Sequence, residues 1–160
     1  MVGYIHNMNH KKRIIFKKSN YDNNSNCNDN NSDCYDSCGI PAVLWLTTDP
    51  RGTTELKTKI RGYASQDQKK NHSTSLEVTD VLEKIVLARG SCQYCDCAVW
   101  LKDYPPRYKK QWTLDRIDNS KGHTIANTVI SCLGCNLRRR RRPYKAFLDG
   151  ERLVMRKVGV

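Results

Sequence analysis

Two pairs of cysteines with the spacing of metal ligands frame the most informative stretch of this sequence. The first pair is Cys92 and Cys95, and the second is Cys132 and Cys135. Within each pair, both sulfurs can face one ion from a single tight turn, and two pairs supply the four thiolates of a tetrahedral zinc site. Cys97 lies near the first pair as a substitute for Cys95, but the Cys-x-x-Cys geometry favours Cys95. The sequence therefore predicts a structural Zn²⁺ site.

Between the cysteine pairs, the sequence predicts a strand, a loop, a second strand and a helix. Residues 112–117 alternate large and polar side chains, as a half-buried strand does. Residues 118–123 are turn formers, residues 124–130 contain a second β-prone run, and a helix opens at Asn136. This order would bring Asp115, at the end of the first strand, close to Asn136. Their side-chain oxygens are hard donors of the kind that Mg²⁺ or Mn²⁺ prefers.

This pattern resembles the HNH endonucleases, also known as the His-Me finger or ββα-metal group, in the version framed by a zinc ribbon. The resemblance rests on the four cysteines together with Asp115, Asn127 and Asn136. It is especially close over residues 114–123, which look like an Asp-Arg-Ile-Asp subgroup common in phages and large DNA viruses. It is strong over residues 92–142. The resemblance implies a small α+β ββα-metal module that hydrolyses DNA phosphodiester bonds.

The resemblance also implies a role for each matching residue. Asp115 and Asn136 would be the protein ligands of one catalytic Mg²⁺ or Mn²⁺, and Asn127 would brace the loop and orient the base. The cation would stabilise charge on the leaving 3′ oxygen while a base deprotonates the attacking water. Plainer roles stay open, with Asp115 as an ion-pair partner, Asn127 as a turn residue and Asn136 as a helix N-cap.

The position directly after Asp115 departs from the family pattern. The HNH endonucleases have their general base, a histidine, at this position, whereas this chain has Arg116, which cannot accept a proton from water. One repair is His123, at the end of the loop, with a turn-capping role as its plainer alternative. In the other repair, Asp118 or metal-bound water serves as the base while Arg116 clamps the phosphate.

Basic residues on both sides of the motif are candidates for nucleic-acid binding. Five consecutive arginines lie on or just past the predicted helix, and two lysines lie in the insertion before the first strand. These residues are Arg138, Arg139, Arg140, Arg141, Arg142, Lys109 and Lys110. We expect them to contact the nucleic-acid backbone, although the arginine run also fits a solvated charge block or a nuclear-import signal. The insertion would either reach a groove of the nucleic acid or cover the zinc site.

Composition supports a nucleic-acid partner, and the resemblance implies that this partner is double-stranded DNA, while composition leaves DNA against RNA open. The 160 residues contain 28 Lys and Arg against 16 Asp and Glu, which gives a formal charge of +12. Such an excess of positive charge favours phosphate binding, and the absence of a long apolar run argues against a membrane. Without a secretory signal, the eight cysteines indicate an intracellular, reducing compartment, cytoplasm or nucleus, in a protein that is possibly virus-encoded. A homodimer is compatible with the sequence.

Upstream of the motif, the sequence divides into two further segments. Residues 1–40 are basic and rich in Asn and predict disorder. Residues 41–90 predict a helical subdomain, in which Pro41 to Leu46 form a strand or a docking segment. One helix begins at Thr53 or Thr54, and a second is capped by Ser75 or Thr79 and ends at Gly90. Residues 91–160 would form the zinc-framed module, with a basic helix and a tail over 152–158 that adds a strand.

Two hypotheses from different classes follow. In the first, the protein is an HNH-type endonuclease that uses a single divalent cation. In the second, it is a catalytically inactive zinc-ribbon protein that binds nucleic acid and has lost the base histidine. Arg116 favours the second hypothesis, whereas the joint presence of Asp115, Asn127 and Asn136 favours the first. The sequence leads to the endonuclease as the first choice.

Overall fold

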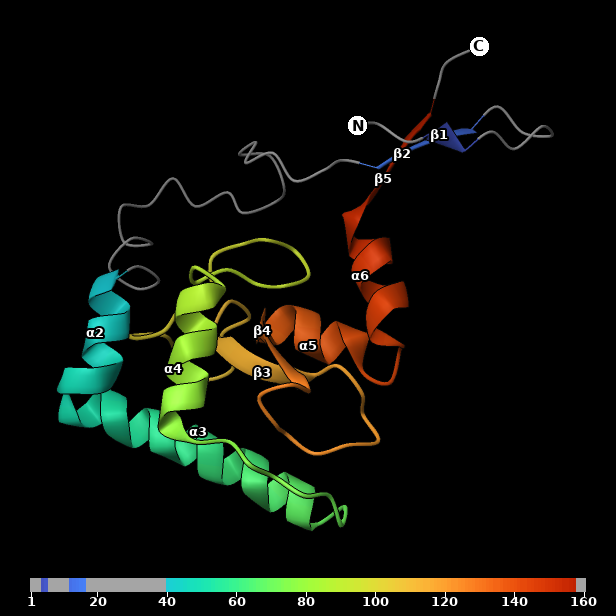
Figure 1. Cartoon of the computed structure of the whole chain (residues 1–160). Helices are drawn as coiled ribbons and strands as arrows, with labels where there is room; N and C mark the ends of the chain where they lie inside the picture. Colours follow the sequence, from blue (N-terminus) through green and yellow to red (C-terminus); the bar gives the residue numbers. More distant parts are fainter. Residues whose placement is uncertain (1–3, 6–11, 17–39, 158–160) are drawn as a thin grey trace.

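A two-stranded antiparallel sheet lies at the centre of the fold, with helices around it (Figure 1). The computed structural model describes residues 4–5, 12–16 and 40–157. Its helices are α2 (Ile40–Thr48), α3 (Pro50–Gln68), α4 (Val78–Leu87), α5 (Leu133–Arg139) and α6 (Tyr144–Arg152). The central strands are β3 (Trp112–Arg116) and β4 (Thr128–Cys132). The described residues therefore form an α+β fold, as the sequence predicts.

The segment that precedes the motif contains three helices rather than the predicted two. Residues Pro41 to Leu46, interpreted as a strand or docking segment, belong to helix α2. Pro41 is tolerated there because a proline in the first helical turn removes no intrahelical hydrogen bond. Ala42 and Leu46 of α2 are fully buried in the core. None of the helices in the described part of the chain is long and apolar enough to cross a membrane.

The starts of α3 and α4 also differ from the sequence-based prediction. Helix α3 begins at Pro50 rather than at Thr53 or Thr54, because the Asp49 side chain caps it by accepting from Arg51 N at 2.8 Å. Helix α4 has Glu77 at its N-cap, in a capping box with Asp80, instead of Ser75 or Thr79. The predicted stop at Gly90 is correct, since this residue has a φ of 63°.

Strands β3 and β4 pair in an antiparallel register that sets the positions of the residues between the cysteine pairs. Trp112 lies opposite Cys132, and Arg116 lies opposite Thr128. The second strand thus spans 128–132 rather than residues within 124–130. All five residues of β3 are buried, so the expectation of a half-buried strand is wrong. The reason is that helices α3 and α5 and the segment around Tyr94 cover both of its faces.

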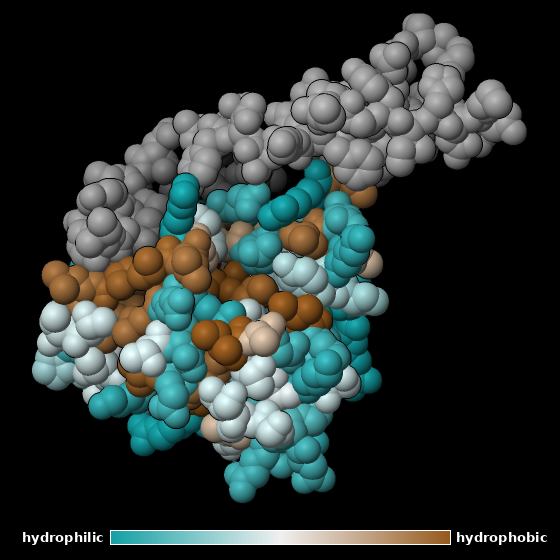
Figure 2. All heavy atoms as spheres, in the orientation of Figure 1, coloured by the Kyte–Doolittle hydropathy of each residue, from teal (hydrophilic) through white to brown (hydrophobic). Residues whose placement is uncertain are grey.

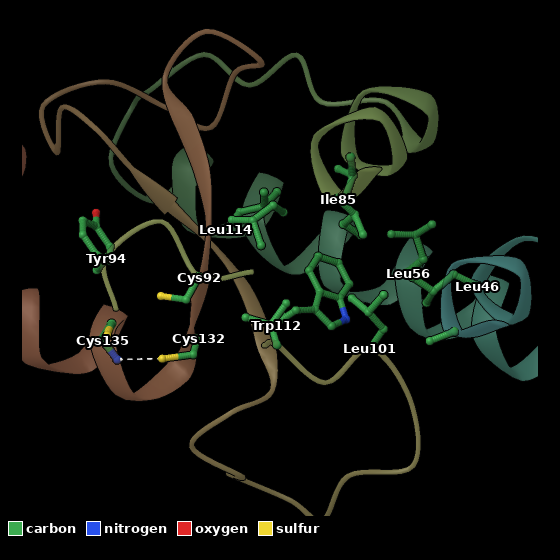
Figure 3. Close-up of a cluster of buried hydrophobic side chains, with 14 of the residues drawn as sticks. Leu46, Leu56, Ile85, Cys92, Tyr94, Leu101, Trp112, Leu114, Cys132 and Cys135 are labelled. Carbon is green, nitrogen blue, oxygen red and sulfur yellow. Dashed lines mark hydrogen bonds between the residues drawn. The ribbon is translucent and has the colours of Figure 1, made fainter. Parts of the chain in front are cut away.

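The core joins the helices to the module framed by the four cysteines. Trp112 lies at its centre, with Leu56 of α3 and Ile85 of α4 on one side and the cysteines on the other (Figure 3). All three of these side chains are fully buried. Helix α5 follows β4 directly, because Cys132 is its N-cap and accepts from Cys135 N at 3.4 Å. The end of β4 and the start of α5 therefore share one tight turn.

A second sheet lies at the far end of α6 (Figure 1). It contains β1 (Tyr4–Ile5), β2 (Lys12–Phe16) and β5 (Leu153–Lys157), all antiparallel, with β2 in the middle. The tail after α6 thus adds a strand, as predicted. The prediction of disorder for residues 1–40 falls mostly outside the described residues.

Candidate functional site

Four cysteine sulfurs meet at one point of the structure. The Sγ atoms of Cys92, Cys95, Cys132 and Cys135 all lie within 4.8 Å of one another, and those of Cys95 and Cys132 are 4.0 Å apart. In a tetrahedral site with zinc–sulfur bonds of about 2.3 Å, the sulfurs are separated by about 3.8 Å. The four thiols can therefore hold a metal ion such as Zn²⁺ with little movement.

The four thiols are coupled through their close contacts. Hydrogen bonds from the neighbouring thiols, Cys135 first, lower the pKa of Cys132, whereas the hydrogen bond to Cys132 raises the pKa of Cys95 and of Cys135. Arg138 Nη2 donates to Cys135 Sγ at 3.1 Å, which brings a positive charge to the rim of the site. Such outer contacts orient metal ligands and stabilise their charge. The insertion of residues 102–110 lies against this turn, since Gly134 N donates to Lys109 O at 2.8 Å.

Each cysteine pair also carries a residue that contacts Asp115. Tyr94, between the first two cysteines, donates its hydroxyl to Asp115 Oδ2 at 2.6 Å. Arg139, one helical turn after Cys135, donates to Asp115 Oδ1 at 2.9 Å and is 1% exposed. Burial and the hydrogen bond to Asp115 raise the pKa of Tyr94, so it stays a donor. The partner of Asp115 is thus Arg139, not the adjacent Arg116.

The donor set of Asp115 and Asn136 fits a hard cation such as Mg²⁺ or Mn²⁺. Asn136 Nδ2 donates to Thr113 Oγ1 at 3.1 Å and to Leu114 O at 3.4 Å, which leaves the amide oxygen for a metal. Each carboxylate oxygen of Asp115 accepts one hydrogen bond, from Tyr94 or from Arg139, and keeps further lone pairs. Arg139 opposes the cation, because its charge partly neutralises the carboxylate. Asn136 is not the helix N-cap, a position that Cys132 takes.

Asn127 ties together both ends of the loop between β3 and β4. Its side-chain oxygen accepts from Asp118 N at 2.9 Å. Its amide nitrogen donates to Asp118 O at 3.0 Å and to Gly122 O at 2.9 Å. With three side-chain hydrogen bonds to backbone groups of the loop, Asn127 makes more contacts than a residue that only forms a turn. These contacts are the ones that a loop-bracing asparagine requires.

His123 is enclosed rather than placed at the surface. It is 3% exposed, its ring stacks on Tyr63 with centroids 4.7 Å apart, and its Nδ1 lies 2.9 Å from Asp67 Oδ1. Its backbone N donates to Asp67 Oδ2 at 2.6 Å. Burial, opposed in part by Asp67, lowers the pKa of the imidazole. His123 thus anchors the loop to the end of α3.

Arg116 opens onto a basic cleft of about 630 Å³. The cleft lies between the α3–α4 connection, the β3–β4 loop and the end of α5. In the view of Figure 2, the lower part of the molecule is largely hydrophilic. Its lining residues are Lys70, His72, Arg116, Asn119, Ser120, Arg140 and Arg141. Four cations around one cavity, with Asn and Ser donors between them, form a surface suited to phosphate groups.

The arginine run does not form a single surface. Arg140 and Arg141 line the cleft, whereas Arg138 pairs with Glu151 at 2.6 Å and Arg142 lies over the Phe147 ring at 4.5 Å. Arg139 points inward to Asp115, so its predicted contact with a nucleic-acid backbone is wrong. A positive φ of 52° at Arg140 ends α5 and separates the inward side chain from the outward ones.

Sequence analysis misses three residues of the site and leaves a fourth open. Tyr94 and Asp67 hold Asp115 and His123, and His72 lines the cleft beside Lys70, whose helix face the sequence leaves open between solvent and phosphate contact. The position of Tyr94 could have been predicted from the sequence. Residues inside a Cys-x-x-Cys turn lie close to the cysteine cluster and to the segments that pack against it. The other three come from the end of α3 and the connection after it, which no local pattern relates to the motif.

Comparisons with known proteins give one likeness. No protein-family model and no curated protein matches the chain. Among solved structures, the chain is similar to that of the rare-cutting HNH restriction endonuclease PacI. The match has 17% sequence identity and a TM-score of 0.45, and it covers 59% of this chain and 72% of the other.

Proposed function

We propose that this protein is an HNH-type endonuclease that hydrolyses phosphodiester bonds in double-stranded DNA. The observation that carries the proposal is the basic cleft beside Arg116, at the end of the strand that holds Asp115. Lys70, Arg140 and Arg141 face this cleft and suit consecutive phosphates of one strand. The family role of each residue comes from the sequence resemblance.

The residues of the site have separate tasks in this proposal. Asp115 and Asn136 would hold one Mg²⁺ or Mn²⁺, which supplies charge stabilisation at the leaving oxygen. Tyr94 and Arg139 orient the Asp115 carboxylate by one hydrogen bond to each oxygen. Arg116 donates to the phosphate from the wall of the cleft, and Asn127 keeps the loop closed. The four cysteines would hold a structural Zn²⁺ that fixes the two Cys-x-x-Cys turns relative to each other.

Cleavage of a labelled DNA duplex with Mg²⁺ or Mn²⁺ tests the proposal. We expect the natural chain to cut, and Asp115→Asn to lower the rate by about 10²-fold or more, because the amide loses the charge that binds a cation. Asp103→Asn is the matched control. Its carboxylate is 68% exposed and pairs with Lys102 at 3.8 Å, away from Asp115, and cutting should change by less than about threefold.

A second candidate function is nucleic-acid binding without hydrolysis. The ion pair between Asp115 and Arg139 favours it, as does the position of Arg116 where the family has its base. Under this alternative, the duplex binds in the cleft and is not cut with any divalent cation. Asp115→Asn would then leave binding unchanged and weaken only the fold.

The endonuclease proposal includes two further expectations from the sequence. The protein would act inside the cell, and it would cut both strands as a homodimer.

A further inference from the structure

Helix α3 carries a row of basic side chains on its outer side, and this row leads into the cleft. We propose that the outer side of α3 is a second contact surface for duplex DNA, which binds the part of the duplex that lies outside the cleft. The inference rests on the proposed function, because it takes the cleft as the place where the reacting strand lies. It assigns no residue to the chemistry of cleavage.

The packing of α3 decides which of its side chains face solvent. Leu56 is fully buried in the core, and the Tyr63 hydroxyl accepts from Leu114 N at 3.0 Å. At the end of the helix, Asp67 accepts from His123 N at 2.6 Å. These three positions of α3 recur at helical spacing, so they form one inward side. The opposite side of the helix is left to solvent.

The acidic residues of α3 are engaged by the rest of the fold. Glu55 accepts a hydrogen bond from the Tyr104 hydroxyl, and Asp67 is fully buried. Lys59 is also turned inward, where its Nζ donates to Trp112 O at 2.9 Å. The charge that α3 presents to solvent is therefore positive and comes from its other basic residues.

Four exposed cations lie on the outer side of α3 and directly after it. They are Lys57, Arg61, Lys69 and Lys70. The first three are four and eight residues apart, a spacing that places them in one row along a helix. No ion pair between residues that the structure describes involves any of the four, whereas Arg51, at the start of α3, pairs with Asp49 at 3.2 Å. Unpaired positive charge on an exposed face attracts phosphate groups.

The side chains between these cations are small and polar. Thr58, Gly62 and Ser65 are all exposed, and a Cβ built on Gly62 would meet nothing within 4 Å. Arg61 Nη2 donates to Thr58 Oγ1 at 3.4 Å, which holds the guanidinium along the helix surface. Hydroxyl groups donate to phosphate oxygens as basic side chains do. A sugar–phosphate backbone can therefore approach this side of α3 closely.

The row is continuous with the cleft. Lys69 ends α3, and the next residue, Lys70, lines the cleft. From Lys57 to Lys69 the helix rises about 18 Å, which is the axial length of about five base pairs. Figure 1 shows α3 along the lower edge of the fold, and the same part of the molecule in Figure 2 is largely hydrophilic. A duplex that enters the cleft beside Lys70 can therefore continue along α3.

One carboxylate lies beside this row and gives the test a variant of opposite sign. Glu77, the N-cap of α4, lines a shallow groove of about 290 Å³ together with Lys57 and Arg61. A negative charge at this place repels phosphate groups. Its removal should therefore strengthen DNA binding, whereas the loss of either cation should weaken it.

Binding of a labelled duplex that extends beyond the cleft, measured at several salt concentrations without added Mg²⁺ or Mn²⁺, tests this surface. We expect Lys57→Ala and Arg61→Ala each to lower the slope of log K against log salt concentration by about 0.9, because each loses one phosphate contact. Alanine favours the helix, so both variants keep the fold. Glu77→Gln, which can still form a capping box, should bind about two- to threefold more tightly.

Arg51→Ala is the matched control from the same helix. It removes one exposed cation, as the two variants do, but the charge of Arg51 is already paired with Asp49. The slope for this variant should equal that of the natural chain. A lower slope for Arg51→Ala, by the same amount as for Lys57→Ala, would show that net charge and not this surface sets the salt dependence.

Acetylation of lysines, read by mass spectrometry with and without the duplex, locates the contact directly. Lys57 and Lys69 should react several-fold more slowly in the complex. Lys84, whose Nζ donates to Thr128 O at 2.7 Å, is the internal control and should react at an unchanged rate.

The results separate this inference from the proposed function. Unchanged slopes for Lys57→Ala and Arg61→Ala, or equal acetylation of Lys57 and Lys69 with and without DNA, would overturn the contact surface and leave the endonuclease in place. A chain that binds the duplex through α3 but never cuts it keeps the surface and removes the endonuclease. A chain that binds no duplex rejects both.

Discussion

At the scale of single residues, Asp67 links the parts of the site. It is the last buried residue of α3 and is fully enclosed. Its carboxylate accepts from the backbone and ring of His123 and lies 3.7 Å from Arg116. A buried carboxylate is tolerated only with such compensation, because removing it from water is costly. Asp67 therefore joins the helical segment to the loop of the motif by charge.

His123 makes the stability of the protein depend on pH. Burial lowers the pKa of the folded imidazole below its ordinary value of 6.5. The unfolded chain then binds a proton at a higher pH than the folded chain, so the free energy of unfolding falls as the pH drops through about 6.5 and levels off below the folded pKa. Urea unfolding from about pH 7.5 to about pH 5.5 should show this loss, and His123→Gln should show less of it. Equal slopes for both proteins would contradict the assignment, provided that zinc content is unchanged.

At the scale of elements, the contact between two loops decides the shape of the cleft. The α3–α4 connection rests on the β3–β4 loop at Gly122, where no space remains for a side chain. Substitution there must separate the loops. Helix α3 also contains Gly62, where a Cβ meets nothing within 4 Å.

These two glycines form a matched pair. We expect Gly122→Ala to destabilise the protein by about 2 kcal/mol or more, because the new methyl group would overlap Ser73 O. Gly62→Ala should stabilise it by about 0.5–1 kcal/mol through helix propensity. Urea unfolding measures both values. A Gly122→Ala protein as stable as the natural chain would show that the two loops are not in contact.

The zinc cluster is the second device at this scale. It joins the turn after α4 to the end of β4 and the start of α5. We expect Cys132→Ser to lower metal content below one zinc per chain and to lower the thermal unfolding temperature by roughly 10 °C or more, because metal binding supplies folding energy. Metal analysis and calorimetry check this. Retention of a full zinc ion by the variant would contradict the four-cysteine site.

At the scale of the whole molecule, the formal charge of +12 gives the protein a general attraction to nucleic acid. The apolar side chains exposed on α2 and α4, Leu44, Val86 and Leu87, lie on helices remote in sequence from the cleft-lining residues. Figure 2 shows hydrophobic residues over these helices and hydrophilic ones toward the lower part of the molecule.

The salt dependence of DNA binding tests whether the cations of the cleft contact phosphates. Each phosphate contact contributes about 0.9 to the slope of log K against log salt concentration. We expect Lys70→Ala and Arg140→Ala each to reduce the slope by about 0.9, because both side chains face the cleft. Arg51→Ala is the control. Its side chain is 80% exposed and pairs with Asp49 at the other end of α3, so the slope should stay unchanged. Equal slopes for all four proteins would place DNA elsewhere.

Local chemistry was sufficient to predict part of this protein. The two Cys-x-x-Cys turns, the strand–loop–strand–helix order and the amphipathic α4 each depend on residues close together in the chain, where spacing alone constrains geometry. The boundaries were less certain, because caps such as Asp49 and Glu77 compete with equally good neighbours. Helix α2 was missed because its apolar residues suit a strand and a buried helix alike.

Only the tertiary structure decided which charges meet. It paired Asp115 with Arg139 instead of the adjacent Arg116, and it enclosed His123 beside Asp67. It also brought Lys70 and His72 to the cleft beside Arg116. These groups lie about 25 to 70 residues apart in sequence, and a charge selects its partner by distance and burial after the core has formed. The sequence determined which chemical groups are present, and packing around Trp112 and the cysteine cluster determined which of them act together.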